Sequence, residues 1–295
     1  MRREAPSAGG VGGSIRGTPS LGGGRLTDAA RNDPEEGLPY EAIAGTTRSG
    51  IVLICDHASN RIPRRLAGLG LDPAALSLHV AWDIGAAALT RALAAQLEAP
   101  AVLSGTSRLV IDCNRAPGHP TSIPAQSHGV PVPSNRDLSS QERSRRERAY
   151  LEPYHRRVAE ALAAVEQDGP APLLASIHSF TPVLSDTPRP WQVGILSDRD
   201  RRVAEFLLTA LRRDGDLVVG DNEPYSGSHP EGYTCRRHGE ELGRPHVLIE
   251  VRQDLLSDDT GVATWTQRLG ALLIAARTAL DAKVLGRATA ARGAA

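Results

Sequence analysis

IVLICDHASN, residues 51–60, is the stretch that decides the fold of this 295-residue chain. Its first five residues are continuously apolar and rich in β-branched side chains, which predicts a strand that is covered on both faces. The residues that follow are polar or small, beginning with Asp56 and His57. Ligands of a doubly wound sheet bind beyond the carboxyl ends of its strands. We therefore expect these two side chains to lie at such an edge.

Similar apolar runs alternate with amphipathic stretches along the rest of the chain. We expect strands at 51–55, 101–103, 108–112, 173–178, 192–196, 217–219 and 246–251. Apolar spacings of three and four predict helices over 151–165, 203–211 and 262–280. Ser139 and Glu142 form a capping box ahead of the first of these helices, and an Ala-rich helix is expected after Asp83. This alternation predicts an α/β fold, a three-layer α/β/α sandwich around a mixed, mostly parallel sheet.

The first 37 residues differ in composition from the rest. Eight glycines fall within the first 24 positions, and large apolar residues are few. Such a segment cannot bury enough apolar surface to offset the entropy of ordering. We expect a disordered Gly-rich tail at 1–37 and a single α/β domain over 38–290.

Composition excludes several classes of partner. Basic and acidic residues number 34 each, and the aromatic residues are only Trp 3, Tyr 5 and Phe 2, so neither a basic field nor a stacking platform for nucleic acid is indicated. The three cysteines form no CxxC pair, which fits a reducing compartment. No apolar run approaches the ~20 residues needed to span a bilayer, and no secretory signal is evident. We expect a cytoplasmic protein that acts on a small molecule and binds neither nucleic acid nor membrane; its oligomeric state stays open.

Strand ends deliver two histidines and a glutamate to one edge of the predicted sheet. His57 and His178 with Asp83 form a set of two histidines and one carboxylate, which open catalytic zinc sites use. Glu250 is the candidate general base. Asp83 also suits a helix cap, and strand-end histidines are often structural. Asn60 is the competing third ligand, although a neutral amide binds zinc less well than a carboxylate does.

Substrate contacts are expected from two further segments. Arg108, Asn114 and Arg115 surround a predicted strand, and arginine binds carboxylates bidentately. A structural pair between Arg108 and Asp112 is the alternative reading. A long polar loop over 221–239 supplies other candidates. The candidates of that loop are Tyr225, Tyr233, Arg237 and His238, and Asn60 completes the set of predicted substrate-binding residues.

The charged run 142–148 is interpreted differently. Its arginines alternate with glutamates, a pattern typical of a solvated helix face.

At the residues just described, the sequence resembles the N-formylglutamate amidohydrolase family. The matching strings, in order between residues 53 and 256, are LICDHASNRIP, HVAWDIGAAAL, SRLVIDCNRAP, ASIHSF, DNEPYSG, YTCRRHG and HVLIEVRQDLL. The family is similar in fold to zinc-dependent exopeptidases and to the zinc amidases of cell-wall remodelling. The resemblance implies a phosphorylase/hydrolase-like fold of the zinc exopeptidase type. It also implies Zn²⁺ or another divalent metal ion on His57, Asp83 and His178, Glu250 as base, and Asn114 with Arg115 on the substrate carboxylate.

The implied activity is metal-dependent hydrolysis of the N-formyl amide of an acidic amino acid. N-formyl-L-glutamate would give formate and glutamate, as in histidine degradation. One string departs from the family, because Asp56-His57-Ala58-Ser59 stands where deformylases of histidine breakdown typically have Pro-His-Ser-Gly. The acyl group and the amino acid therefore stay open, and another N-acyl amino acid or a peptide is an alternative substrate.

Two other classes of function remain at this point. Cys55 or Ser59 beside His57 would suit a metal-free hydrolase. A non-catalytic ligand-binding protein on the same fold is the other alternative.

Overall fold

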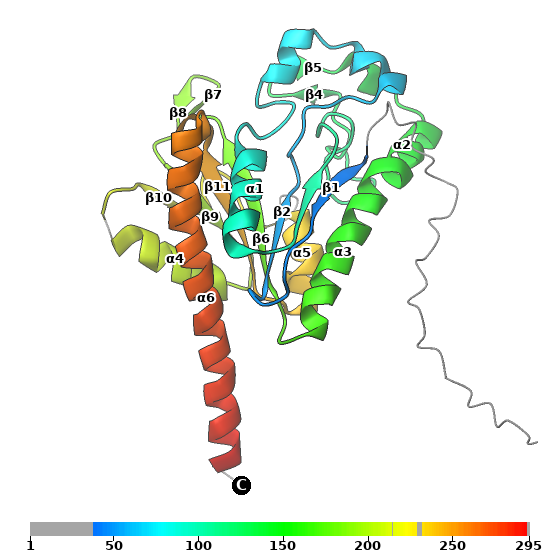
Figure 1. Cartoon of the computed structure of the whole chain (residues 1–295). Coiled ribbons are helices and arrows are strands. Elements are labelled where there is room, and N and C mark those ends of the chain that lie inside the picture. Colours follow the sequence, from blue (N-terminus) through cyan, green and yellow to red (C-terminus); the bar gives the residue numbers. More distant parts are fainter. Residues whose placement is uncertain (1–37, 214, 229–231, 294–295) are drawn as a thin grey trace, which may run out of the picture. The chain divides into compact units, whose positions relative to one another are not determined.

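A seven-stranded sheet runs through the computed structural model in the order β1-β3-β2-β6-β11-β9-β10 (Figure 1). The structure describes residues 38–213, 215–228 and 232–293, with side chains described as far as residue 282. The tail predicted at 1–37 lies outside the described residues, and the single-domain interpretation of 38–290 stays a prediction. The strands of the sheet are Tyr40–Ile43 (β1), Ile51–Cys55 (β2), Ala101–Ser104 (β3), Leu173–Phe180 (β6), Val193–Leu196 (β9), Val219–Asp221 (β10) and His246–Arg252 (β11).

The sheet is mixed and mostly parallel, as predicted. β2 is parallel to both β3 and β6, and β6 is parallel to β11. β1 runs antiparallel to β3, and β9 runs antiparallel to β11 with β10 parallel beside it. The four central strands therefore point their carboxyl ends toward the same edge.

Helices cover both faces of the sheet, which confirms the three-layer sandwich (Figure 1). The helices are Ala86–Leu97 (α1), Ser140–Arg146 (α2), Glu152–Gln167 (α3), Arg202–Arg213 (α4), Tyr233–His238 (α5) and Asp259–Gly293 (α6). In β2, Ile51, Leu53 and Cys55 pack into the core that contains α1, α4 and α6. Val52 and Ile54 pack into the core that contains α3. Burial on both faces is the reason why this strand is apolar at every position.

Residues 108–112 form a buried turn, so the strand predicted there is wrong. The Val110 N–H donates to the carbonyl of Ser107 (2.9 Å), and the Leu109 carbonyl accepts from the Asn135 amide (2.8 Å). The apolar side chains of the turn pack with α3. A short apolar run indicates that a segment is buried, and burial alone does not distinguish a strand from a buried turn.

Arg146 corrects the interpretation of 142–148 as a solvated face. Its side chain is buried and donates to the Val110 carbonyl (3.1 Å), to the Asn135 side-chain oxygen (2.7 Å) and to Glu142 (3.1 Å). Because each of these groups needs a partner when it leaves water, the arginine stabilises the buried turn from within.

Smaller differences concern short or edge strands. The strand predicted at 217–219 begins only at Val219. The edge strand β1 was not predicted from the sequence. Two hairpins lie outside the main sheet, Gln126–Ser127 (β4) with Val130–Pro131 (β5) and Val183–Leu184 (β7) with Thr187–Pro188 (β8). Among the described residues, no helix combines the length and the apolar character that crossing a bilayer requires.

Gly85 is the N-cap of α1, and a substitution there tests how closely the loop before this helix is packed. Its φ is +82°, and an added Cβ would lie 2.4 Å from Leu256 Cβ and 2.9 Å from the Leu256 carbonyl oxygen. We expect Gly85→Ala to lower the free energy of unfolding by about 2–4 kcal/mol, because left-handed backbone and overpacking both oppose the methyl group. Gly118→Ala is the matched control, since φ is +72° there and nothing lies within 4 Å. It should lose only about 1 kcal/mol in denaturant titration, and equal losses in both variants would contradict the expectation.

Candidate metal centre and active site

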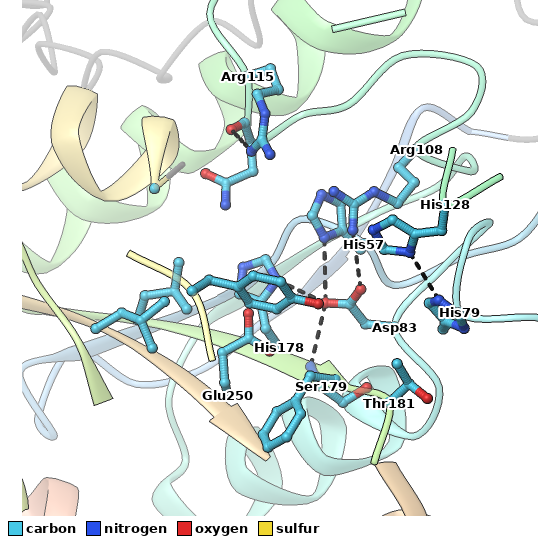
Figure 2. A pocket seen from close by; sticks show the side chains of 16 residues that line it. His57, His79, Asp83, Arg108, Arg115, His128, His178, Ser179, Thr181 and Glu250 are labelled. Atoms are coloured by element: carbon cyan, nitrogen blue, oxygen red, sulfur yellow. Dashed lines mark hydrogen bonds and ion pairs between the residues drawn. The ribbon is translucent and has the colours of Figure 1, made fainter. Parts of the chain in front are cut away.

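Polar side chains from three strands and one loop meet at the edge where the central strands end (Figure 2). His57 follows β2, and His178 lies on β6. The register of β6 against β11 places Glu250 directly beside His178. Asp83 precedes α1, and its N–H donates to the carbonyl of His57 (3.0 Å), which holds the loop against the end of β2.

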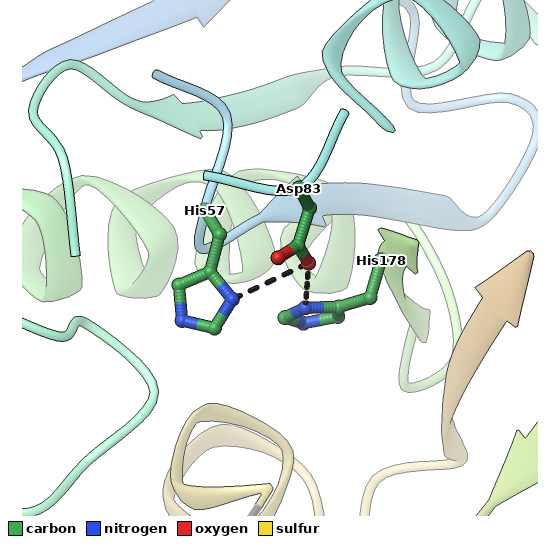
Figure 3. A group of neighbouring side chains, drawn as sticks. All are labelled: His57, Asp83 and His178. Carbon is green, nitrogen blue, oxygen red and sulfur yellow. Dashed lines mark hydrogen bonds and ion pairs between the residues drawn. The ribbon is translucent and has the colours of Figure 1, made fainter. Parts of the chain in front are cut away.

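His57, Asp83 and His178 form a buried triad (Figure 3). Asp83 Oδ2 lies 3.3 Å from His57 Nδ1 and 2.8 Å from His178 Nδ1. The possible ligand atoms of all three residues lie within 4.8 Å of one another, so the triad could hold a metal ion. The N-cap of α1 is Gly85, without a side-chain capping bond. The Asp83 carboxylate therefore faces the imidazoles and does not cap the helix.

Asn60 does not join this triad. Its amide nitrogen donates to the Leu76 carbonyl (2.8 Å). The structure thus brings Asp83 to the two histidines and leaves Asn60 in a structural contact.

The outer nitrogen of each triad histidine contacts a second carboxylate. His57 Nε2 lies 2.7 Å from Asp112 Oδ1, and His178 Nε2 lies 3.2 Å from Asp56 Oδ2. Metal-binding histidines generally donate their second ring N–H to a carboxylate, carbonyl or water, which fixes the tautomer. With the proton on Nε2, both Nδ1 lone pairs face the centre of the triad. This arrangement is the one that a metal ligand requires.

Asp56 is itself held by a set of donors. It accepts from the hydroxyls of Tyr154 (2.9 Å), Thr234 (2.6 Å) and Ser176 (3.1 Å). Burial raises the pKa of this carboxyl, but the bonds from His178 and Thr234 and the charge of the imidazoles outweigh it and lower the pKa to about 2. Asp56 is therefore ionised and fixed at neutral pH.

Asp112 is anchored in the same way. Its Oδ1 accepts from the Asn114 N–H (2.8 Å), and its Oδ2 accepts from Arg108 (2.8 Å). Sequence reasoning missed the support of the histidines by Asp56 and Asp112. The only available signal was position in the sequence. Asp56 directly precedes His57, and Asp112 lies two residues before Asn114.

The field of the site favours positive charge. Burial lowers the pKa of His57 and His178, yet the surrounding carboxylates raise the pKa of both above its ordinary value. Asp56, Asp112 and Glu250 surround the triad, which itself contains Asp83. Arg108 pairs with two of these four carboxylates, 2.8 Å from Asp112 and 3.6 Å from Asp83 Oδ1. A divalent cation would compensate this excess of negative charge.

Glu250 differs from the other carboxylates. Its side chain is buried, and its Oε2 has no hydrogen-bond partner among the described residues. Burial raises the pKa of Glu250 to about 7, because the loss of water outweighs the lowering by His178. A buried polar atom without a partner calls for an explanation. At the wall of an open pocket, that atom is available to a water molecule or a substrate.

The pocket over the triad contains half of the predicted substrate-binding residues. Arg108, Asn114 and Arg115 line it, and so does Tyr225 from the loop after β10. Arg108 forms the predicted pair with Asp112 and also lines the pocket, so its substrate contact stays a prediction. Arg115 Nη1 donates to the Asn114 carbonyl (3.0 Å), and Asn114 Oδ1 accepts from the Thr234 N–H (3.1 Å), which positions this pair at the pocket wall.

Four of the predicted substrate contacts lie outside the pocket lining. Besides Asn60, these are Tyr233, Arg237 and His238 on α5. The Tyr233 hydroxyl accepts from Arg237 (2.9 Å). His238 is buried, and its Nε2 lies 3.0 Å from Nδ1 of His155. Helix α5 therefore turns His238 into the interior and leaves Tyr233 only partly buried, which polar composition alone did not reveal.

Comparisons with known proteins show what the chain is similar to. A family model described as N-formylglutamate amidohydrolase matches residues 49–257. The crystal structure of a gene product from Agrobacterium tumefaciens has a TM-score of 0.80 at 35% identity, with 83% of this chain and 97% of that chain covered. The structure of an N-formylglutamate amidohydrolase from Ralstonia eutropha has a TM-score of 0.59 at 21% identity, with 81% and 97% covered. No curated protein matches this chain.

The carboxylates behind the histidines should control metal affinity. Asp112→Asn removes a charged acceptor from His57 Nε2, and we expect it to weaken the binding of a divalent ion by about 10–100-fold. Competition with a chromophoric chelator measures this affinity. Asp216→Asn is the control, because Asp216 is exposed, pairs with Arg268 and is distant in sequence from Asp112. Unchanged affinity in Asp112→Asn would contradict the assigned role.

Proposed function

The chain belongs to the N-formylglutamate amidohydrolase family, hydrolases of amide C–N bonds, and on that premise we propose that it cleaves the N-formyl amide of an acidic amino acid such as N-formyl-L-glutamate in a metal-dependent reaction. The observation that carries the proposal is the triad itself. His57 and His178 direct Nδ1 toward Asp83 while Asp112 and Asp56 contact Nε2, and the unpartnered Glu250 oxygen lies in the same pocket.

The residues present fit a zinc ion. Two imidazole nitrogens and one carboxylate oxygen are the protein ligands of open catalytic zinc sites. His57, Asp83 and His178 would hold the ion, and the buried carboxylates around them would balance its charge. A cation held there would polarise the amide carbonyl and lower the pKa of water in the pocket.

Glu250 would act as the general base and then as the general acid. Its free oxygen takes a proton from the water molecule that attacks the formyl carbon. The C–N bond then breaks, and Glu250 returns the proton to the leaving amine nitrogen. The products are formate and the free amino acid. A carboxyl with a pKa near 7 suits both transfers, because it gains and loses a proton near neutral pH.

Arg115 and Asn114 would hold the carboxylate of the amino acid. Arginine offers two parallel N–H donors that match a carboxylate. The Asn114 side-chain oxygen already accepts from Thr234, which leaves its amide NH₂ as the donor toward a ligand. Arg108 has a different function, since it pairs with Asp112 and keeps that carboxylate in place.

The structure gives no support to a metal-free nucleophile. Cys55 is fully buried, and burial raises the pKa of its thiol well above the ordinary value, which disfavours the thiolate that a nucleophile requires. Both ring nitrogens of His57 contact carboxylates and are not available to activate Ser59.

Formate release from N-formyl-L-glutamate by the zinc-loaded protein tests the proposal. We expect turnover that a strong chelator abolishes and added Zn²⁺ restores. Glu250→Gln should retain the metal but lower kcat by about 100–10,000-fold, because the amide cannot accept the proton. Glu160→Gln on the exposed face of α3 is the control and should keep full activity. Activity that survives metal removal, or a fully active Glu250→Gln, would overturn the mechanism.

The pH profile reports the ionisation of Glu250. The base must be deprotonated, so kcat/KM should fall as the pH falls through the Glu250 pKa. Burial raises that pKa to about 7, and a bound cation would lower it, so the acidic limb should lie at or below pH 7. A rate that increases toward acidic pH would be inconsistent with a basic role for this residue.

A further inference from the structure

Two histidines that the proposed mechanism does not use face each other at the pocket wall (Figure 2). His79 Nε2 lies 2.9 Å from His128 Nδ1, and the ring centroids are 5.0 Å apart. His79 comes from the loop before α1, and His128 comes from the turn between β4 and β5. Both line the pocket that contains the triad and Arg115. Two separate segments therefore bring imidazoles to one place beside the proposed reaction centre.

His128 occupies a turn position at which asparagine or aspartate is the favoured residue. Ser127 pairs with Val130, so His128 and Gly129 are the two central residues, and their φ values are 44° and 84°. A two-residue turn with positive φ at both positions favours Asn-Gly or Asp-Gly. A non-glycine residue in this region costs about 1–3 kcal/mol and is commonly found at functional sites. Histidine is among the residues that tolerate this conformation, so the observation that points to a function is the contact of the His128 imidazole with His79 in the pocket lining.

The hydrogen bond between the two rings leaves one donor for a ligand. If the His79 Nε2–H donates, the proton of His128 remains on its outer Nε2. If the His128 Nδ1–H donates instead, the proton of His79 remains on its outer Nδ1. In either arrangement of the neutral pair, one outer N–H is available.

The surroundings of the pair favour an anion. Burial, then the neighbouring His79, Arg108 and Arg189, lower the pKa of His128 to about 4. His79 responds in the same direction to burial, Arg189 and Arg108, with Asp83 opposing. Burial is the largest of these causes, and the two arginines near the pair add the positive charge that would attract an anionic group of a ligand.

We propose that the His79–His128 pair is a subsite for a second carboxylate of the substrate. The inference rests on the proposed function, because it assumes that an N-acyl amino acid occupies this pocket. Figure 2 shows the pair on one side of Asp83 and Arg115 on another. A substrate that reaches from Arg115 across the triad would present its second acidic group to the histidines. That group belongs either to the amino-acid side chain or to a dicarboxylic acyl group.

Three substrates separate these sources. N-formyl-L-glutamate has a side-chain carboxylate, N-succinyl-L-glutamine has an acyl carboxylate, and N-formyl-L-glutamine has neither. The zinc-loaded wild-type protein should show a kcat/KM about tenfold or more higher for one of the first two than for N-formyl-L-glutamine. The preferred compound identifies the source of the carboxylate, and no preference would overturn the proposal.

His128→Asn removes the imidazole and retains a residue that suits the turn. We expect it to raise KM for the preferred substrate about tenfold, with kcat little changed and N-formyl-L-glutamine unaffected. His79→Gln should act in the same way, which guards against a folding defect of one variant. Gln126→Ala, exposed on the same hairpin and outside the pocket lining, is the control. Equal effects on all substrates, or none, would overturn the subsite.

A direct binding measurement separates failure of the subsite from failure of the proposed function. If the wild-type protein hydrolyses none of the three compounds, the proposed hydrolysis is wrong, and binding of a ligand at the subsite can still be measured. Calorimetric titration with L-glutamate, N-succinyl-L-glutamine and L-glutamine then decides. Tighter binding of either of the first two than of L-glutamine, lost in His128→Asn, supports the subsite, and equal binding of all three ligands rejects it.

Discussion

The contacts between two buried carboxylates and the outer nitrogens of two histidines are the constraint on which the site depends. Asp112 and Asp56 fix the tautomer and orientation of His57 and His178, so both Nδ1 atoms point at Asp83. A buried carboxylate is tolerated only when donors surround it. The fold supplies those donors from distant elements, such as Tyr154 on α3 for Asp56. The packing of helices on the sheet is thereby linked to the orientation of the triad.

The acidic groups of the site are of two kinds. Asp56, which is surrounded by donors, has a lowered pKa and stays ionised. Glu250 has an oxygen without a partner, and burial raises its pKa toward neutrality. One set of groups is therefore suited to hold charge permanently and the other to exchange a proton. This difference comes from local hydrogen bonding, because three hydroxyls donate to Asp56 and no described residue donates to Glu250 Oε2.

Much of the architecture was predictable, and the errors have physical causes. The run at 51–55 indicated a doubly covered strand because only burial on both faces makes every position apolar. The run at 108–112, whose three central residues are apolar, is a turn, since its carbonyls bond to Asn135 and Arg146 rather than to a neighbouring strand. Arg146 lies in a charged run yet is buried, because it satisfies that turn. Partners distant in sequence decided both outcomes.

The sequence by itself determined that His57, His178 and Glu250 would share an edge, because residues at the ends of parallel strands meet there. Only the tertiary structure decided that Asp83 rather than Asn60 completes the triad and that α5 turns His238 into the interior. It also decided that Asp56 and Asp112 support the histidines. Those contacts join positions as far apart as Thr234 and Asp56, 178 residues along the chain. Local periodicity contains no information about such contacts, because packing between elements sets them.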